Sequence, residues 1–154
     1  MSFSVDGKTV IVTGAANGIG AALARHFAEN DANVMCADID EKALKKDLGQ
    51  SGDDSNVRYF AGDLREKLTL ANLLSATVDA FDRVDVLVNA SRQVATTDPL
   101  DMDDETVEKL LQQNLMTSLR LSQMVAKRMI KQDEEQDHEF AGTIINLSSI
   151  AARL

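Results

Sequence analysis

The stretch that decides the fold is TGAANGIG, residues 13–20. It follows an apolar run at 9–12, which predicts a buried strand, and it precedes AALARHFA at 21–28, which predicts a helix. Glycine lets the backbone turn sharply, and its missing side chain lets a ligand approach the main chain. The helix that begins there points unpaired N–H groups and the positive end of its dipole at the loop. A diphosphate suits such a loop.

Length and composition predict one domain, 1–154, with a sizeable core. The hydrophobic content of 44% and the charged content of 27% are typical of soluble globular proteins. A net charge of −9 argues against nucleic acid or an anionic membrane as a partner. The single cysteine, Cys36, excludes an internal disulfide and suits a reducing compartment. No apolar stretch approaches the roughly 20 residues needed to span a bilayer, and the N-terminus does not read as a secretory signal, so we expect a cytoplasmic location.

Strands and helices are expected to alternate along the chain. Several predicted strands are continuous Val/Ile/Leu runs, as in a parallel sheet covered on both faces. Repeated units of this kind predict an α/β fold, a doubly wound (Rossmann-like) parallel sheet with strand order 3-2-1-4-5. We expect strands at 8–13, 33–37, 57–60, 84–89 and 143–148, helices at 18–30, 41–48, 67–81 and 103–131, and loops at 49–56, 91–100 and 132–142.

The last predicted helix carries one polar residue in an apolar face. At helical spacing, Asn114 shares that face with five apolar residues. A buried amide without partners costs about 1–3 kcal/mol. We therefore expect Asn114 to bond either a backbone group or a ligand-linked water. The five apolar residues are Val107, Leu110, Leu111, Leu121 and Val125.

A carboxylate, Asp38, ends the second predicted strand. In a dinucleotide-binding fold, an acid roughly 20 residues after the glycine loop accepts hydrogen bonds from the adenosine ribose hydroxyls. It also repels a 2′-phosphate, so Asp38 favours NAD over NADP. The alternative is that Asp38 is a turn residue at a strand end and that 13–20 is an ordinary tight turn.

The chain resembles the short-chain dehydrogenase/reductase family over essentially its full length. The glycine loop and Asp38 match that family's cofactor loop and NAD-selecting acid. GDL at 62–64, NAS at 89–91, Asn114 and IINLSS at 144–149 match four further motifs in the same order. The resemblance implies that Asp63 bonds the adenine amino group and that 89–91 lies against the cofactor.

The resemblance also implies site residues. Ser149 would be the catalytic serine that holds the substrate oxygen, and Asn114 would order a water that links a catalytic lysine to solvent. No metal site is expected, because the two histidines are isolated from other ligands. The implied cofactor-binding residues are Gly14, Asn17, Gly18, Ile19, Gly20, Asp38, Ile39, Asp63, Leu64, Asn89, Ala90 and Ser91.

The sequence departs from the family pattern in three places. Ser91 stands where the family usually has glycine, and Ala152 and Arg153 stand where it often has a glycine. The family's Tyr-x-x-x-Lys pair, whose spacing of four places both side chains on one helix face, would follow Ser149 by roughly a dozen residues. The sequence contains no such pair, and its only tyrosine, Tyr59, lies in the third predicted strand.

These observations predict the N-terminal portion of an NAD-dependent alcohol or carbonyl oxidoreductase, inactive by itself. Its expected partners are a small-molecule substrate and either further copies of the chain, as a dimer or tetramer, or a C-terminal portion. The fifth strand would then be an uncovered edge. Two alternatives stay open: a dinucleotide-binding module without catalysis, and an enzyme split over two chains.

Overall fold

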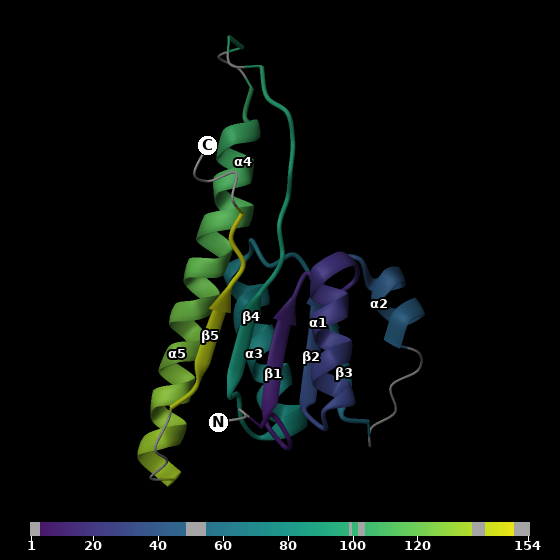
Figure 1. Ribbon diagram of the computed structural model, residues 1–154. Coiled ribbons are helices and arrows are strands. Elements are labelled where there is room, and N and C mark those ends of the chain that lie inside the picture. Colours follow the sequence, from purple (N-terminus) through teal and green to yellow (C-terminus); the bar gives the residue numbers. More distant parts are fainter. Residues whose placement is uncertain (1–3, 49–54, 99, 102–103, 137–140, 150–154) are drawn as a thin grey trace.

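Five parallel strands form one sheet in the order β3-β2-β1-β4-β5 (Figure 1), which confirms the predicted α/β fold and strand order. The computed structural model of the chain describes residues 4–48, 55–98, 100–101, 104–136 and 141–149. Most of the predicted loop at 49–56, together with Ala152 and Arg153, lies outside the described residues. The elements are β1 (Thr9–Thr13), α1 (Gly18–Glu29), β2 (Asn33–Asp38), α2 (Glu41–Leu48), β3 (Val57–Ala61), α3 (Lys67–Phe81), β4 (Val86–Asn89), α4 (Thr106–Leu111), a π-helical turn η1 (Gln112–Met116), α5 (Thr117–Gln136) and β5 (Thr143–Asn146).

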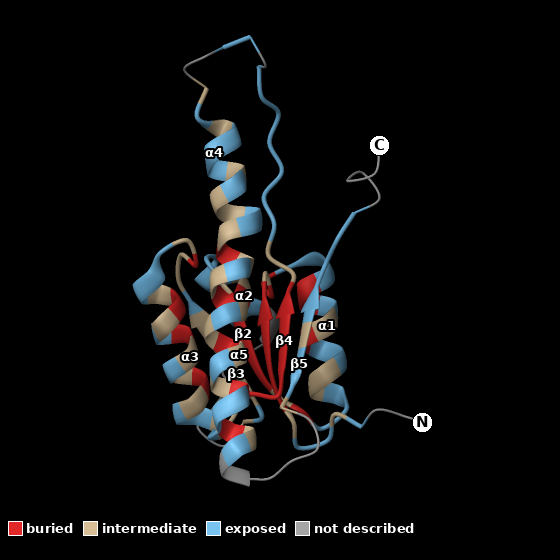
Figure 2. Cartoon of the chain, turned by 90° about the vertical axis from the view of Figure 1, so that its left-hand side faces the viewer, coloured by how far each residue is buried: buried red, intermediate tan, exposed pale blue. Residues whose placement is uncertain are grey.

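Helices cover both faces of the central strands. Side chains of a strand alternate between the two faces of its sheet. Val10 and Val12 of β1 accordingly pack with residues of α1 and α2, whereas Ile11 packs with α3 and α5 on the opposite face. Every residue of β1 and β4 is buried, and Figure 2 shows these strands in red at the centre of the molecule. Burial on both faces explains why the strands are continuous apolar runs.

The long last helix differs from the helix predicted over 103–131, because a π turn interrupts it. The turn η1 inserts between α4 and α5 and breaks the 3.6-residue periodicity on which the predicted face rests. Leu121 and Val125 are buried as expected, but Val107 and Leu111 are about half exposed. Asn114 lies in η1 and is exposed. The prediction of one buried face that contains Asn114 is therefore wrong.

The end of α5 is held by a buried amide. The Gln132 side chain accepts a hydrogen bond from the Val84 N–H (2.9 Å) and donates one to the Val84 carbonyl (2.9 Å). Arg128 donates a further hydrogen bond to the same amide oxygen (2.8 Å). Residues 132–136 are helical, so the loop predicted there is wrong over this stretch. β4 begins at Val86, two residues later than predicted, and Val84 bonds the Gln132 side chain instead of a neighbouring strand.

β5 is exposed on one side. Ile144 packs against the buried cluster that includes residues of α5. Ile145 and Leu147 lie outside this cluster and are 38% and 44% exposed. Figure 2 shows this strand in pale blue beside the buried β4. In the described part of the chain, the fifth strand is the uncovered edge that the sequence predicts.

Candidate functional site

The glycine loop lies where the strand order of the sheet reverses. β1 pairs with β2 on one side and with β4 on the other, so the segments that follow β1 and β4 meet at the carboxyl edge. Ligands of open α/β sheets bind at such a point. The Thr13 hydroxyl joins the two segments, because it accepts hydrogen bonds from the N–H groups of Ala90 (3.1 Å) and Ser91 (3.2 Å) and donates to the Val88 carbonyl (3.4 Å).

At each of the three glycines of the loop, the absence of a side chain has a different steric consequence. A Cβ at Gly14 would lie 2.8 Å from the Cα of Ser91, and a Cβ at Gly20 would collide with the carbonyl oxygen of Gly14. At Gly18, φ is +54°, and a Cβ would meet nothing within 4 Å. Gly14 and Gly20 therefore let the protein pack against itself. Gly18 instead keeps the space in front of the loop free, which is the space a bound ligand would need.

Helix α1 begins without a cap from a side chain. Asn17 at the N-cap makes no side-chain hydrogen bond to the helix, and the first turn holds no acidic residue. The first N–H groups of any α-helix lack partners within the helix, and the helix dipole favours an anion there. Ile19 in this turn is 63% exposed. Together with the free space at Gly18, this helix end fits the diphosphate of a dinucleotide.

Asp38 connects the end of β2 to the glycine loop. Its Oδ2 accepts a hydrogen bond from the Ala16 N–H (3.1 Å), and its Oδ1 accepts one from the Asp40 N–H (3.1 Å). A carboxylate has about four acceptor positions, so Asp38 can also accept hydroxyl groups of a ligand. The neighbouring Ile39 is exposed. The carboxylate thus lies beside the loop, as the sequence predicts, and its bond to Ala16 is an additional finding.

Asp63, two residues beyond β3, already has a partner within the chain. The Nε of Arg65 donates to both of its carboxylate oxygens (2.9 and 3.0 Å), and Arg65 Nη2 donates to Oδ2 (2.5 Å). These hydrogen bonds hold the pKa of the Asp63 carboxyl below its usual value, so it is ionised at neutral pH. The adjacent Leu64 is buried and packs in the core. An amino group that bonded Asp63 would share the carboxylate with Arg65.

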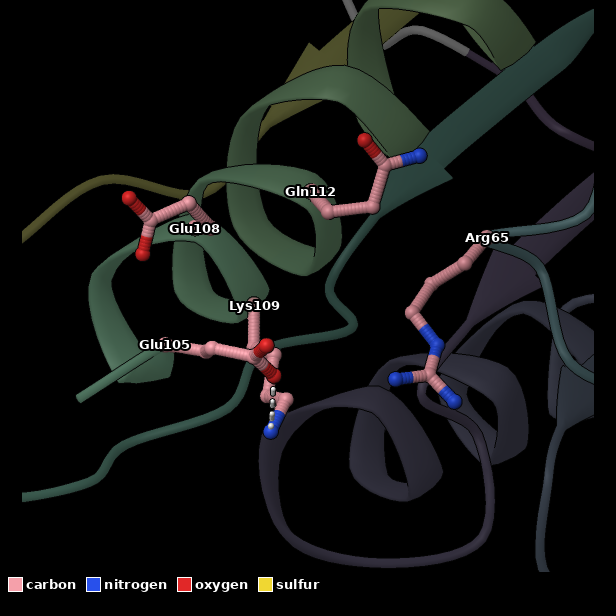
Figure 3. A pocket seen from close by; sticks show the side chains of 5 residues that line it. All are labelled: Arg65, Glu105, Glu108, Lys109 and Gln112. Atoms are coloured by element: carbon pink, nitrogen blue, oxygen red, sulfur yellow. Dashed lines mark ion pairs between the residues drawn. The ribbon is translucent and has the colours of Figure 1, made fainter. Parts of the chain in front are cut away.

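A cavity of about 400 Å³ flanks the Asp63 end of this edge. Figure 3 shows Arg65 on one side of the cavity and residues near or within α4 on the other. Lys109 and Glu105 form an ion pair across 3.2 Å at its margin. No residue of the glycine loop lines it, so the cavity lies beside the candidate site and does not contain its centre. The lining residues are Arg65, Glu105, Glu108, Lys109 and Gln112.

The end of β4 is fixed by a polar contact with two other elements. The Asn89 amide donates hydrogen bonds to Ser122 Oγ of α5 (3.0 Å) and to Asn146 Oδ1 of β5 (2.8 Å). These bonds orient the segment 89–91, whose next two N–H groups bond Thr13. The hydroxyl of Ser91 is buried and has no hydrogen-bond partner among the described residues.

Asn114 holds the extended segment that follows Ser91. Its Oδ1 accepts a hydrogen bond from the Gln93 N–H (2.7 Å), and its Nδ2 donates to the Gln93 carbonyl (2.8 Å). Figure 1 shows this segment running alongside α4. Of the two partners predicted for Asn114, a backbone group or a ligand-linked water, the structure shows the backbone group, whereas the expected burial of Asn114 is wrong. A π turn frequently marks a functional position in a helix.

Ser149 lies just beyond β5 at the same edge of the sheet. Asn146, the last residue of β5, pairs in register with Asn89, the last residue of β4, so the two strands end side by side. Ser148 and Ser149 follow as exposed residues. The predicted site residues therefore extend along one edge, from Asp63 after β3 to Ser149 after β5. Which of them touch a ligand stays a prediction.

Other kinds of site receive no support in the described ranges. No group of three or more His, Cys, Asp or Glu residues gathers there to hold a metal ion. Cys36 is buried in β2, and this burial raises the pKa of its thiol to about 12, so it is a packing residue and a poor nucleophile. None of the described helices combines the length and the apolarity that crossing a bilayer requires.

Comparison with known proteins gives a consistent result. Residues 8–154 match the family described as short chain dehydrogenase. An uncharacterised oxidoreductase of Thermotoga maritima is 33% identical over 151 residues, which cover 96% of this chain and 56% of that protein. A D-threitol dehydrogenase of Mycolicibacterium smegmatis is 32% identical (97% and 55% covered), and an NAD-dependent glycerol dehydrogenase of Listeria innocua is 27% identical (97% and 56% covered). The chain spans about half the length of the curated relatives it matches.

Proposed function

This chain belongs to the short-chain dehydrogenase family, and from that premise we propose that it is the NAD-binding portion of an alcohol or carbonyl oxidoreductase. The observation that carries the proposal is the carboxylate of Asp38, bonded to the glycine loop at 3.1 Å beside the open space at Gly18. Phosphate and ribose contacts are thereby available side by side. Relatives named D-threitol dehydrogenase, glycerol dehydrogenase and diacetyl reductase support a small alcohol or carbonyl compound as the substrate.

Each end of the dinucleotide has its own group of residues in this proposal. The start of α1 holds the diphosphate, Asp38 accepts the adenosine ribose hydroxyls, and Asp63 bonds the adenine amino group. The segment 89–91 lies against the nicotinamide half, and Ser149 holds the substrate oxygen. The bound cofactor supplies or accepts the hydride. The protein must orient the substrate and move a proton on its oxygen.

Residues 1–154 contain neither a Tyr-x-x-x-Lys pair nor another tyrosine than Tyr59 of β3. We therefore propose that these residues bind NAD but do not turn over substrate by themselves. A titration of the complete protein with NAD, NADH and NADP tests the binding half of the proposal. Saturable heat with NAD or NADH is the expected result. A protein that is folded by circular dichroism but gives no heat with any of the three cofactors contradicts the proposal. If NAD or NADH binds, turnover of a panel of alcohols by the complete protein distinguishes an enzyme from a binding module without catalysis.

Asp38→Ala is expected to weaken NAD binding about 10-fold or more and to relax the rejection of NADP. A hydrogen bond to a charged group contributes about 1.5–3 kcal/mol, and removing the carboxylate also removes the repulsion of a 2′-phosphate. The measurement is the ratio of the Kd values for NADP and NAD. Asp38→Asn is the matched control, because its amide oxygen can still accept the Ala16 N–H. Equal affinity of the unmutated protein for both cofactors contradicts the assignment.

We also propose that the complete protein forms a homo-oligomer through the outer side of the last helix. Val107, Leu111, Leu115 and Leu119 recur four residues apart through α4, η1 and α5, and each is between 45% and 55% exposed. Residues four apart are neighbours on a helix surface, and the wider π turn of η1 suits a repeat of four residues better than one of 3.6, so we expect the four side chains to share one side. Leu115→Glu is expected to halve the mass found by light scattering, while far-UV circular dichroism stays unchanged. A monomeric unmutated protein contradicts this proposal.

A further inference from the structure

One buried hydroxyl at the carboxyl edge of the sheet is not explained by the fold. Ser91 Oγ has no hydrogen-bond partner among the described residues, although it is hidden from solvent. Burying a hydroxyl without a partner is destabilising, so native proteins rarely keep such a group unless it has another role. Two other buried side-chain oxygens in the described ranges share this state, Thr9 Oγ1 and Asp133 Oδ1. Thr9 is the first residue of β1, so it lies where the parallel strands begin, opposite to the carboxyl edge where Ser91 lies.

The backbone at Ser91 is fixed, whereas no hydrogen bond fixes its side chain. Its N–H donates to Thr13 Oγ1 (3.2 Å), and its Cα lies 2.8 Å from the position that a Cβ on Gly14 would take. The residue as a whole is only partly buried. The hydroxyl can therefore turn to another staggered rotamer without breaking a hydrogen bond of its own. That freedom suits a group whose partner arrives with a ligand.

The position along the sheet edge decides which part of a dinucleotide the hydroxyl meets. Asp38 ends β2 on one side of β1, and Ser91 follows β4 on the other side. If the adenosine ribose lies at Asp38 and the diphosphate at the start of α1, the second ribose and its phosphate reach the end of β4. The phosphate and hydroxyl oxygens of that half accept hydrogen bonds.

We propose that the Ser91 hydroxyl donates a hydrogen bond to the ribose or the phosphate of the nicotinamide half of NAD. This inference rests on the proposed function, because it assigns a new contact to the same site. It makes Ser91 a cofactor-binding residue through its side chain, at a position where a glycine would offer none.

Ser91→Ala and Thr9→Val together test the inference. Both substitutions delete an unpartnered buried hydroxyl, so neither should lower the Tm of the ligand-free complete protein. Ser91→Ala should weaken NAD and ADP-ribose about 10-fold and leave AMP, which carries only the adenosine half, unchanged in isothermal titration calorimetry. Thr9→Val should bind all three probes as the unmutated protein does.

The outcomes separate this inference from the proposed function. If Ser91→Ala binds NAD and ADP-ribose with the same affinities as an unmutated protein that binds NAD, the inference is wrong and the proposed function stands. An equal loss for AMP, or a lowered Tm of ligand-free Ser91→Ala, assigns Ser91 a structural role and also overturns the inference. If the unmutated protein binds none of the three probes, both fail.

Discussion

Gly18→Ala is expected to abolish measurable NAD binding, with a loss of at least about 100-fold, while leaving the protein folded. A Cβ at Gly18 meets no protein atom within 4 Å, so the added methyl group enters the space that the proposed diphosphate occupies. The backbone has φ of +54° there, and an L-residue in that region costs about 1–2 kcal/mol. Calorimetric titration gives the affinity, and urea denaturation gives the free energy of unfolding.

Gly7→Ala is the matched control for this experiment. Gly7 precedes β1, has φ of +67°, and a Cβ there also meets nothing within 4 Å. The two variants should therefore lose similar stability, and only Gly18→Ala should lose NAD. Gly20→Ala serves as a third comparison, because its Cβ collides with the Gly14 carbonyl and should destabilise the fold itself. Equal NAD affinity in the Gly18 and Gly7 variants would show that the diphosphate does not lie over this loop.

The sheet was predictable from the sequence because its strands obey one simple constraint. Strands buried on both faces carry apolar residues on both, so the central positions of β1, β2 and β4 stand out as continuous apolar runs, with polar residues confined to the strand ends. Right-handed crossovers and the glycine loop after β1 then leave few arrangements of five strands. Asp38 was predictable for the same reason, because any residue that ends a parallel strand lies at the carboxyl edge.

Features that depend on a single long-range contact were not predictable. The π turn at Asn114 is paired with the backbone of Gln93, 21 residues away, and periodicity carries no information about that contact. The sequence predicts a loop that starts at Gln132, yet Gln132 lies within α5 and its side chain bonds the backbone of Val84, 48 residues away.

The candidate site shows the same division. Sequence motifs indicate which residues gather at the carboxyl edge, because strand ends fix their positions. They do not indicate the state of each side chain. The unpartnered hydroxyl of Ser91 and the bond between Asp38 and Ala16 emerge only when all neighbours are placed. Both features concern how the site meets a ligand, so they are the ones that the binding experiments address.

Ser149→Ala in the complete protein is expected to lower kcat about 100- to 1,000-fold, the usual effect of losing one aligned hydrogen-bond donor at a reacting oxygen. Its affinity for NAD should stay within about twofold, because the proposed cofactor contacts follow β1, β2, β3 and β4, whereas Ser149 follows β5. The measurement combines steady-state turnover of an accepted alcohol with calorimetric titration of NAD.

Ser148→Ala is the control for this last prediction, because Ser148 is its immediate neighbour and is also exposed. Successive residues of an extended segment point in opposite directions, so only one of the two hydroxyls can face the substrate oxygen. Full turnover in Ser148→Ala with loss in Ser149→Ala supports the assignment. The reverse pattern moves the role to Ser148, and unchanged turnover in both variants places the substrate oxygen away from the end of β5.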